Sequence, residues 1–426
     1  MKRVVITGIG AVSPMGNSLK TSWEALKEGV SGIASLTRFD ASGIKWKVAG
    51  ELKGFDASRY LSQKEISHLD PFVQYAVAAS LMAAEDAGLA SQLSAFSYQQ
   101  SDGKNENFSL LTSHFSLASG GVIIGSSRGG ITTIENGLNR SSRSNRSRLS
   151  PFLMPSTSIG MAASYVAQKM GLKGYCLGIS NACASGANAI GEAYRLLKAG
   201  YKGPVLAGGA EAPICRLCIE GYGVSGALSK INDSSASRPF DRTRDGFVLA
   251  EGACVLVLED YETALKRGAK IYGEIIGYGN TTDAFHQTRP SHEGEARTIS
   301  TAIKEAGINI KDIDYISAHG TSTVLGDKAE TEAIKLVFGK RAYEIPVSSV
   351  KSMTGHMLSA SGAFEAAAVL MSMNEGVIIP TINLKQRDPQ CDLNYVTETK
   401  KGDIKVAVSN SFGFGGVNAV LVFRRV

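Results

Sequence analysis

Runs of apolar residues alternate with amphipathic stretches along the whole chain, and this alternation predicts a layered α/β protein. In the first half, strands are expected at 4–7, 122–124, 176–179, 204–207 and 254–258, and helices at about 71–87, 158–169 and 185–199. In the second half, strands are expected at 272–276, 315–318, 346–348, 405–408 and 419–423, and helices at 294–306, 328–338 and 360–374.

The order of the predicted elements restarts near the middle of the chain. Each half contains strands and helices in a similar order, so we divide the chain into halves at 1–260 and 261–426. The repeat is architectural, because no residue-level self-similarity accompanies it. The segment 91–119 interrupts the pattern, since it is rich in Ser, Gln and Asn and lacks periodicity. It is predicted to be a surface insertion.

The composition is that of an ordinary globular protein. The chain has 426 residues, of which 43% are hydrophobic and 20% charged, enough for a substantial core. A net charge of +6 is too mild for a nucleic-acid binder but leaves room for an acidic partner on a local basic patch. No apolar run approaches the ~18 residues of a membrane span, and the basic start lacks the apolar stretch of a signal peptide. We expect a cytoplasmic protein with no membrane and no nucleic-acid partner.

The six cysteines are spread over the chain, which argues against a disulfide framework. Cys215 and Cys218 have the C-x-x-C spacing of some redox and metal sites. No second such pair and no matching pair of histidines accompanies them, so coincidence is favoured. The sequence therefore predicts no metal site.

Cys183 stands in a turn of small residues where a predicted strand gives way to a predicted helix. The segment 181–186 reads Asn-Ala-Cys-Ala-Ser-Gly. At a helix N-terminus, unpaired N–H groups and the helix dipole favour the thiolate. The small neighbours admit a substrate thioester, and the turn can offer a backbone N–H to an oxyanion. A lone cysteine is more often a small buried side chain, so this position alone does not establish a nucleophile.

Two histidines and a lysine occupy comparable positions in the second half. His319 begins the segment 319–323, His-Gly-Thr-Ser-Thr, and His356 ends the segment 351–356, Lys-Ser-Met-Thr-Gly-His. Each histidine follows an apolar strand and lies among Gly, Ser and Thr residues. A single histidine is more often structural, whereas two at strand ends, with Lys351 five residues before one of them, favour a functional role.

The segment 410–416 reads Asn-Ser-Phe-Gly-Phe-Gly-Gly. We interpret it as a Gly-rich turn with two phenylalanines. Such a turn lowers the stability of the fold, so a purely structural role is disfavoured. It suits a loop whose backbone approaches a ligand, with an aromatic side chain as a gate. The segment lacks the Gly-Lys-Ser/Thr ending of a phosphate-binding P-loop, so that role is discounted.

These residues together indicate a particular chemistry. One cysteine with one histidine would suggest a hydrolase or transferase of the papain kind. A second histidine adds a further hydrogen-bond donor, which hydrolysis does not need. Two neutral imidazoles can donate hydrogen bonds to an oxygen that becomes an enolate, as decarboxylation of a malonyl thioester requires. Lys351 could polarise or orient them, and the carbanion would attack an acyl-cysteine.

The chain resembles the elongating β-ketoacyl-acyl-carrier-protein synthases, above all synthase II of bacterial fatty-acid synthesis. The similarity runs essentially end to end, through the order Cys183, His319, Lys351, His356 and Gly-Phe-Gly-Gly at 413–416, with matching segments at 237–241, 244–248 and 326–330. The resemblance implies an α/β thiolase-like fold: a five-layered α/β/α/β/α sandwich of two similar halves, working as a dimer. It implies no cofactor, since substrates arrive on the phosphopantetheine of acyl-carrier protein, although some members hold a structural monovalent cation.

The resemblance also implies roles for individual residues. An acyl group moves from carrier protein to Cys183, and His319 and His356 then promote decarboxylation of malonyl-carrier protein. The N–H groups of Cys183 and Phe414 form the oxyanion hole. The other implied roles are catalytic support by Lys351, gating by Phe414, Phe412, Gly413 and Asp283, pantetheine binding by Thr321 and Thr323, and structural support by Glu330 and Glu365.

Some features depart from the family pattern, the insertion at 91–119 among them. Arg128 stands where synthase II members carry an apolar residue that comes from the dimer partner and floors the acyl tunnel. A charge in an apolar pocket is costly unless paired, so either Arg128 turns away or the pocket is not built for a long alkyl chain. Gly226, Ser67 and His68 replace basic contacts to carrier protein. The predicted docking face is instead Lys64, Arg143, Arg146 and Arg148.

Several functions compete. The first is a housekeeping fatty-acid synthase II, and segment 412–414 favours it. The second is the ketosynthase of a type II polyketide or specialised fatty-acid pathway, either a homodimer or a heterodimer with a chain-length factor that lacks the cysteine. Segments 210–214 and 246–252, with Arg128, favour this second role, and we prefer it. Cys183 argues against a non-catalytic scaffold subunit, and the His-Lys-His set argues against a degradative thiolase.

Overall fold

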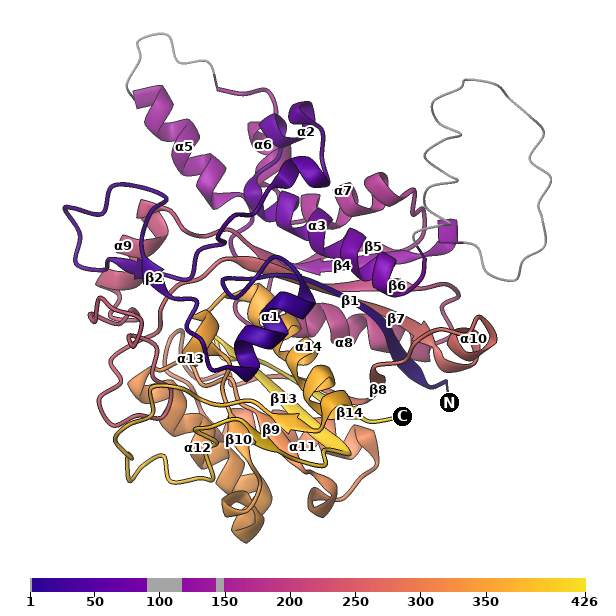
Figure 1. The fold of residues 1–426 in the computed structure, drawn as a ribbon, viewed down its shortest axis with the longest axis vertical. Coiled ribbons are helices and arrows are strands. Elements are labelled where there is room, and N and C mark those ends of the chain that lie inside the picture. The colour runs from indigo at the N-terminus through magenta and orange to yellow at the C-terminus, as the bar shows by residue number, and fades with distance from the viewer. Residues whose placement is uncertain (1, 90–116, 143–148) are drawn as a thin grey trace.

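The computed structural model describes residues 2–89, 117–142 and 149–426 (Figure 1). The first-half strands are β1 (Val4–Val12), β4 (Gly121–Gly125), β5 (Cys176–Ile179), β6 (Val205–Glu211) and β7 (Gly252–Asp260), and they lie in the order β1-β7-β6-β4-β5. Strand β4 pairs in parallel with β5 and β6, whereas β6–β7 and β7–β1 are antiparallel. Parallel strands are covered on both faces, which explains the continuous apolar runs of the sequence.

The second half repeats this arrangement. Its strands are β8 (Gly273–Thr282), β9 (Tyr315–Ser317), β10 (Val347–Ser348), β13 (Val406–Gly413) and β14 (Val417–Arg424), in the order β8-β14-β13-β9-β10. Strand β9 pairs in parallel with β10 and β13, and β13–β14 and β14–β8 are antiparallel. The two halves therefore have the same strand order and the same directions. A short pairing of β1 with β8 joins them into one mixed sheet of ten strands.

Helices complete the layers on both sides of each half-sheet (Figure 1). Helices α8 (Ser185–Lys198) and α14 (Ser359–Glu375) pack on each other between the two half-sheets. Helices α3 (Pro71–Asp86) and α7 (Met161–Met170) cover the outer face of the first half, and α11 (His292–Ala306) and α12 (Val324–Phe338) that of the second. The predicted five-layered sandwich of two similar halves is confirmed. The central helix α14 is almost wholly buried, and its Ala-rich sequence allows close packing on both sides.

Each predicted strand and helix overlaps an observed one, but the sequence patterns do not predict several further elements. The additional helices are α1 (Leu19–Lys27), α2 (Gln63–His68), α5 (Ile131–Ser142), α6 (Leu153–Thr157), α9 (Arg216–Val224), α10 (Tyr261–Lys266) and α13 (Lys351–Thr354). Two small two-stranded sheets pair β2 (Ala34–Ser35) with β3 (Val48–Ala49) and β11 (Val377–Ile378) with β12 (Lys400–Lys401). None of the helices in the described ranges is long and apolar enough to cross a membrane.

The structure corrects one predicted loop. The sequence predicts a Gly-rich turn over 410–416, yet the first four residues of this segment continue strand β13. Only Phe414, Gly415 and Gly416 form the turn to β14, and both glycines have positive φ. The predicted insertion at 91–119 falls outside the described residues except for its last three, as do Arg143, Arg146 and Arg148 of the predicted docking face.

Candidate active site

Cys183 lies in the tight connection between β5 and α8. Helix α8 begins at Ser185, and its cap residue Ala184 makes no side-chain hydrogen bond to the first turn. Ala182 has a φ of 46°, a left-handed conformation that a side chain rarely adopts and that strains the backbone at this point. The Ser185 hydroxyl closes the turn, since it accepts from the Asn181 N–H at 2.7 Å and donates to the Ala182 carbonyl at 2.6 Å. The nucleophile therefore stands on a rigid turn in front of a helix.

The pKa of the Cys183 thiol differs from the one that the sequence predicts. Burial raises the pKa of the Cys183 thiol to about 11. The Lys351 charge and a hydrogen bond from the Phe414 N–H act in the opposite direction but do not offset burial. The prediction that this position favours the thiolate is therefore wrong in its net effect, because burial outweighs the Lys351 charge and the Phe414 hydrogen bond. In the substrate-free site this raised pKa favours the neutral thiol over the thiolate.

His319 follows strand β9, and a buried carboxylate holds its backbone. The N–H groups of His319 and Gly320 donate to the two oxygens of Glu330 at 2.8 and 2.7 Å. The Asn410 side-chain amide donates to the same carboxylate at 2.9 Å. Glu330 lies on α12, so it ties the histidine turn to the outer helix and to strand β13. The supporting role that the resemblance implies for Glu330 stays a prediction.

His356 follows the short helix α13, not a strand end as predicted, because helix α13 lies between β10 and this histidine. It is held by a strand-like contact. Its N–H donates to the Val248 carbonyl at 2.7 Å, and its carbonyl accepts from the Ala250 N–H at 2.9 Å. Its Nδ1 lies 3.2 Å from the Ser361 hydroxyl, which also accepts from the Met357 N–H at 2.9 Å. The side chain is thus fixed from both its backbone and its ring.

Lys351 is almost fully buried and connects the two histidine segments. Its Nζ donates to the His319 carbonyl at 2.7 Å, lies 3.3 Å from His319 Nδ1, and forms an ion pair with Glu365. Burial raises the pKa of Glu365 to about 7, although the Lys351 charge pulls it down. The structure therefore contains the predicted Lys351–Glu365 pair, and the lysine contacts the histidine directly.

These contacts assign the protons on both imidazole rings. The Ser361 hydroxyl accepts from the Met357 N–H, and among the contacts of the described residues His356 Nδ1 is the one acceptor for its own proton. The Lys351 ammonium can only donate, so His319 Nδ1 must accept. Because Nδ1 accepts in each ring, Nε2 carries the hydrogen. Both histidines therefore present an N–H donor on the side of the ring away from these partners.

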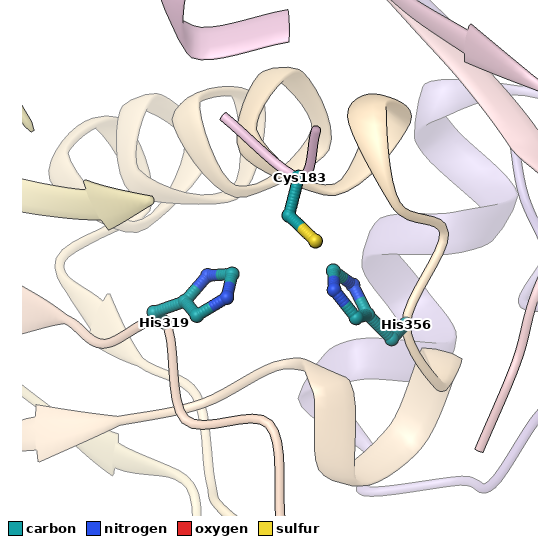
Figure 2. A group of neighbouring side chains, drawn as sticks. All are labelled: Cys183, His319 and His356. Carbon is teal, nitrogen blue, oxygen red and sulfur yellow. The ribbon is translucent and has the colours of Figure 1, made fainter. Parts of the chain in front are cut away.

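Both histidines are neutral. Burial and the nearby Lys351 charge lower the pKa of His319 and of His356 well below the ordinary histidine value. Their rings are nearly perpendicular, with centroids 5.4 Å apart. The Cys183 sulfur and one nitrogen of each histidine all lie within 4.8 Å of one another, and Figure 2 shows the three side chains converging on one space. Two imidazole rings and a thiol thus face one common space.

A cavity of about 290 Å³ opens onto this group. Phe412 is buried beside His319, with ring centroids 6.0 Å apart, whereas Phe414 at the hairpin turn is 38% exposed. A Cβ added to Gly413 would lie 3.2 Å from the Cys183 nitrogen, so this hairpin passes directly over the nucleophile. The predicted site residues that line the cavity are Cys183, Asp283, Thr321, Thr323, His319, Glu330, His356, Phe412, Gly413 and Phe414.

Asp283 links the loop after β8 to the hairpin. Its carboxylate accepts from the Asn418 amide at 2.6 Å and from the Ser291 N–H at 2.9 Å. Its own N–H donates to the Gly416 carbonyl at 2.7 Å. Asp283 therefore ties the turn that carries Phe414 to the start of helix α11, and its gating role stays a prediction.

Thr321 and Thr323 lie together at the start of α12. Their hydroxyl oxygens are 3.0 Å apart, and Thr323 also caps the helix by accepting from the Gly326 N–H. Both line the cavity beside His319. They offer two polar groups to a ligand that enters toward Cys183.

Arg128 is not among the residues that line the cavity. Its Nε donates to the hydroxyl of Tyr222 at 2.8 Å, and Tyr222 does line the cavity. The family resemblance places this position in the partner's tunnel, but here the side chain lies against a wall of its own chain's site. Lys64 lies exposed on helix α2, far along the sequence from the catalytic segments, and its docking role stays a prediction.

Several contacts in the site have no clear signal in the sequence. Ser361 sets the proton position on His356, and Asn410 supports Glu330, yet neither stands out by residue type. Phe247 packs edge-on against His356 at 5.2 Å. Tyr222 lies on α9, a helix that the sequence pattern does not predict because of its glycines. The only signal for Ser361 is its place one turn beyond His356 at the start of α14.

Cysteine and histidine are also ligand types that Zn²⁺ accepts, and the Cys183–His319–His356 group is compact enough to hold such an ion. The same atoms serve acyl transfer, so the geometry does not distinguish the two uses. The absence of a metal stays a prediction.

Comparisons with known proteins agree with the site. The model of the β-ketoacyl synthase N-terminal domain matches residues 1–264, and that of the C-terminal domain matches residues 272–385. A relative from Synechocystis sp., 3-oxoacyl-[acyl-carrier-protein] synthase 2, is 44% identical and covers 100% of this chain and 98% of its own.

Solved structures of ketosynthases share the fold over the full length. The ishigamide ketosynthase/chain length factor has a TM-score of 0.90 at 33% identity and covers 100% of this chain and 99% of its own. A type II PKS acyl-carrier protein in complex with its ketosynthase bound to the hexaketide gives a TM-score of 0.86 at 34% identity, with 100% of both chains covered. With both family domains matched and its nucleophile and histidines gathered in one cavity, this chain belongs to the β-ketoacyl synthase family of acyltransferases.

Proposed function

We propose that the chain condenses an acyl group held on Cys183 with malonyl-acyl-carrier protein to give a β-ketoacyl-carrier protein. The observation that carries this proposal is the convergence of one thiol and two neutral imidazole N–H donors within 4.8 Å. A hydrolase needs one base beside its nucleophile. Two donors aimed at the same space suit a reaction in which a carbonyl oxygen gains negative charge after CO₂ leaves.

The reaction divides into two steps. The Cys183 sulfur attacks the acyl-carrier thioester, and the proton of its thiol passes to the carrier sulfur, which leaves as a free thiol while both histidines stay neutral. Malonyl-carrier protein then loses CO₂ while His319 and His356 donate hydrogen bonds to its thioester oxygen. The carbanion attacks the acyl-Cys183 carbonyl, and the Cys183 thiolate is the leaving group.

The backbone around Cys183 supports stabilisation of the oxyanion formed in each attack. The Phe414 N–H already points at the Cys183 sulfur, to which it donates a hydrogen bond. The Cys183 N–H lies beside Gly413 in the same hairpin contact. We infer that these two N–H groups form the oxyanion hole, and that Thr321 and Thr323 hold the pantetheine arm.

Two pathways fit this chemistry. The full-length relatives named 3-oxoacyl-[acyl-carrier-protein] synthase 2 are compatible with housekeeping fatty-acid elongation. The matched structures include a type II PKS ketosynthase, and the sequence departures at Arg128 and in segments 210–214 and 246–252 favour a specialised polyketide or fatty-acid role. Three further expectations stay predictions. The chain forms a homodimer or a heterodimer with a Cys-less chain-length factor, and it is cytoplasmic. Carrier protein docks on the basic residues Lys64, Arg143, Arg146 and Arg148.

Reconstitution tests the proposed function. The purified chain is mixed with an acylated carrier protein and malonyl-carrier protein, with a Cys-less chain-length factor added to test the heterodimer. The masses of the carrier-bound products are measured by mass spectrometry. A β-ketoacyl product longer by two carbons is expected. Substituting His356→Ala is expected to lower malonyl decarboxylation by about 10²-fold, the usual loss for a main oxyanion donor. Unchanged decarboxylation in this variant would remove His356 from the mechanism.

The pH dependence of decarboxylation tests the neutral state of the histidines. Because the pKa values of His319 and His356 are lowered well below 6.5, both rings stay neutral as the pH falls from 8 to 6. The rate of CO₂ release by Cys183→Ala, which carries no titrating thiol, is expected to be flat over this range. A half-loss near pH 6.5 would show that an ordinary histidine controls the step.

We also propose a structural monovalent cation beside Glu365. In the described part of the chain, Glu365 Oε2 and Asn410 Oδ1 are buried without a hydrogen-bond partner, and both residues lie near Glu330. Oxygen ligands of this kind suit a hard cation. KCl is expected to raise the thermal unfolding midpoint above that in tetramethylammonium chloride of equal ionic strength, and Asn410→Ala should abolish the difference. Equal midpoints for the unsubstituted chain would refute the site.

A further inference from the structure

Glu295 is a buried acid in the wall of the cavity that contains Cys183. It lies in the first turn of helix α11, is only 2% exposed and is one of the residues that line the cavity. Its Oε2 has no hydrogen-bond partner among the described residues. A buried oxygen without a partner costs free energy, so this side chain needs a partner that its own chain does not supply.

The start of helix α11 is held tightly, which fixes the place of Glu295. Strand β8 lies so close to the helix that a Cβ on Gly279 would clash with the Thr298 carbonyl. Gly294, directly before Glu295, is pressed against Asp283 in the same way, since a Cβ there would clash with the aspartate carboxylate. The helix cannot shift easily, so the Glu295 carboxyl stays in the cavity wall.

The charged groups that act on Glu295 are all acidic. Burial, and then the charges of Glu330, Asp283 and Asp327, raise the pKa of Glu295 well above the ordinary value of a glutamate. Of these neighbours, Asp283 and Glu330 also line the cavity, but both already accept hydrogen bonds from backbone N–H groups and side-chain amides. Glu295 is therefore a neutral carboxylic acid near neutral pH, with an O–H donor and a carbonyl acceptor.

The chemistry of a neutral carboxyl group limits what it can bind. Its acidic neighbours disfavour an anion, such as the carboxylate of a malonyl group, and a saturated acyl chain offers no polar atom. A metal ion is disfavoured as well, because Glu295 is not in the one compact group of possible ligands that the described residues form. An amide is complementary, because it also offers one donor and one acceptor side by side. In the proposed substrates, the pantetheine arm carries such amides.

Glu295 lies on the side of the cavity where Thr321 stands. Glu330 is close enough for its charge to act on Glu295, and it accepts a hydrogen bond from the Gly320 N–H, directly before Thr321. Helices α11 and α12, which carry the two glutamates, pack against each other. An arm that enters past Thr321 toward Cys183 therefore passes the wall that contains Glu295.

We propose that Glu295 binds the pantetheine arm, donating its O–H to the carbonyl of one amide and accepting a hydrogen bond from the N–H of that amide. This inference rests on the proposed function and deepens it, because it assigns a further binding residue for the arm that both substrates carry. The same contact would then serve the acyl-transfer step and the malonyl step.

Single-turnover acylation of Cys183 tests the pairing. The donor is the butyryl thioester of pantetheine, which has amides, or that of pentanethiol, which has none, and mass spectrometry of the intact protein follows the reaction. Glu295→Leu offers no hydrogen bond and is expected to lower the second-order rate constant with butyryl-pantetheine about 10-fold. It should not lower the rate constant with butyryl-pentanethiol, which also shows that the variant is folded.

Two further variants separate hydrogen bonding from charge and from helix structure. Glu295→Gln still offers a donor and an acceptor, so its rate constant with butyryl-pantetheine should stay within about threefold of that of the unsubstituted chain. Glu293 is an exposed glutamate in the same helix turn and does not line the cavity. Glu293→Leu is therefore expected to leave both rate constants unchanged.

The malonyl step provides an independent measurement. Release of CO₂ from malonyl-pantetheine should fall in Glu295→Leu by about the same factor as acylation by butyryl-pantetheine, because both substrates carry the arm. A loss with malonyl-pantetheine alone would show that Glu295 binds the malonyl group, and the amide pairing would be wrong.

The possible failures are distinguishable. If Glu295→Leu reacts with butyryl-pantetheine as fast as the unsubstituted chain, or loses the same factor with both butyryl donors, the pairing is refuted while the condensing function stands. If no donor acylates Cys183 in the unsubstituted chain, the proposed function itself fails, and the pairing fails with it.

Discussion

Substituting Cys183→Ala is expected to abolish condensation, with a loss on the order of 10⁴-fold or more, as for removal of other covalent nucleophiles. The physical reason is that the acyl group then has no thiol beside the two histidines on which to form a thioester. Of the described cysteines, only Cys183 lies with two histidine nitrogens inside 4.8 Å. The measurement is the mass of the protein after incubation with acyl-carrier protein, together with the yield of β-ketoacyl product.

Controls distinguish the loss of the reactive thiol from a loss of folding. Cys254 is also a free cysteine, but it is fully buried in strand β7, where its backbone pairs with Ala11 and Gly209 of the neighbouring strands. Cys254→Ala should keep acylation of the enzyme, and Cys183→Ala should keep the unfolding transition of the unsubstituted chain. Persistent acylation of Cys183→Ala would show that the nucleophile lies elsewhere.

Substituting Lys351→Met is expected to lower the free energy of unfolding by about 3–5 kcal/mol, the usual cost of removing one partner of a buried ion pair. Lys351 and Glu365 are both essentially inaccessible to solvent. The substitution leaves the Glu365 charge without its partner and the His319 carbonyl without its donor. Urea unfolding followed by circular dichroism measures the change.

The pH dependence and a second variant identify the cause. Burial holds the pKa of Glu365 at about 7 even beside Lys351, well above the value of an unfolded glutamate. Without the lysine this pKa rises further, so the folded state binds a proton that the unfolded state releases, and stability falls as the pH rises. The loss in Lys351→Met should therefore be larger at pH 8 than at pH 6. The double variant Lys351→Met with Glu365→Gln should recover much of the lost free energy of unfolding. If the single and the double variant lose the same free energy, the ion-pair explanation is contradicted.

The architecture and the reactive residues can be predicted from local patterns in the chain. Period-2 and continuous apolar runs place every strand of the ten-stranded sheet, because a buried strand needs apolar residues whatever its neighbours are. The six helices that pack on the half-sheets are also placed by their apolar residues. Helices such as α8 and α11 show a one-sided 3.6-residue period, whereas α3 and α14 are apolar stretches buried on most sides. Cys183, His319, Lys351 and His356 stand out because small and polar residues follow the ends of apolar strands.

Other elements escape prediction because their local signals are weak. Helix α9 contains Gly221 and Gly223, which lower helix propensity, and its stability comes from packing, as the contact of Gly223 with Trp46 illustrates. The apolar run predicts that strand β13 ends before Asn410, although its pairing with β14 continues to Gly413. Glycine disfavours strands locally, and here the partner strand overrides that preference.

How the reactive residues behave depends on contacts that arise only when the chain folds. Desolvation at Cys183 depends on everything packed around it, so the raised pKa of the thiol cannot be inferred from the helix N-terminus alone. The proton positions on the histidines depend on Ser361 and Lys351, whose side chains reach them through the fold. Arg128 is an apparent anomaly in the sequence, and its partner is a tyrosine 94 positions away that only folding brings to its guanidinium. Local patterns determine which chemical groups the chain contains and where they stand in it. Burial and long-range contacts determine the protonation and the orientation of these groups, because both depend on residues far apart in the sequence.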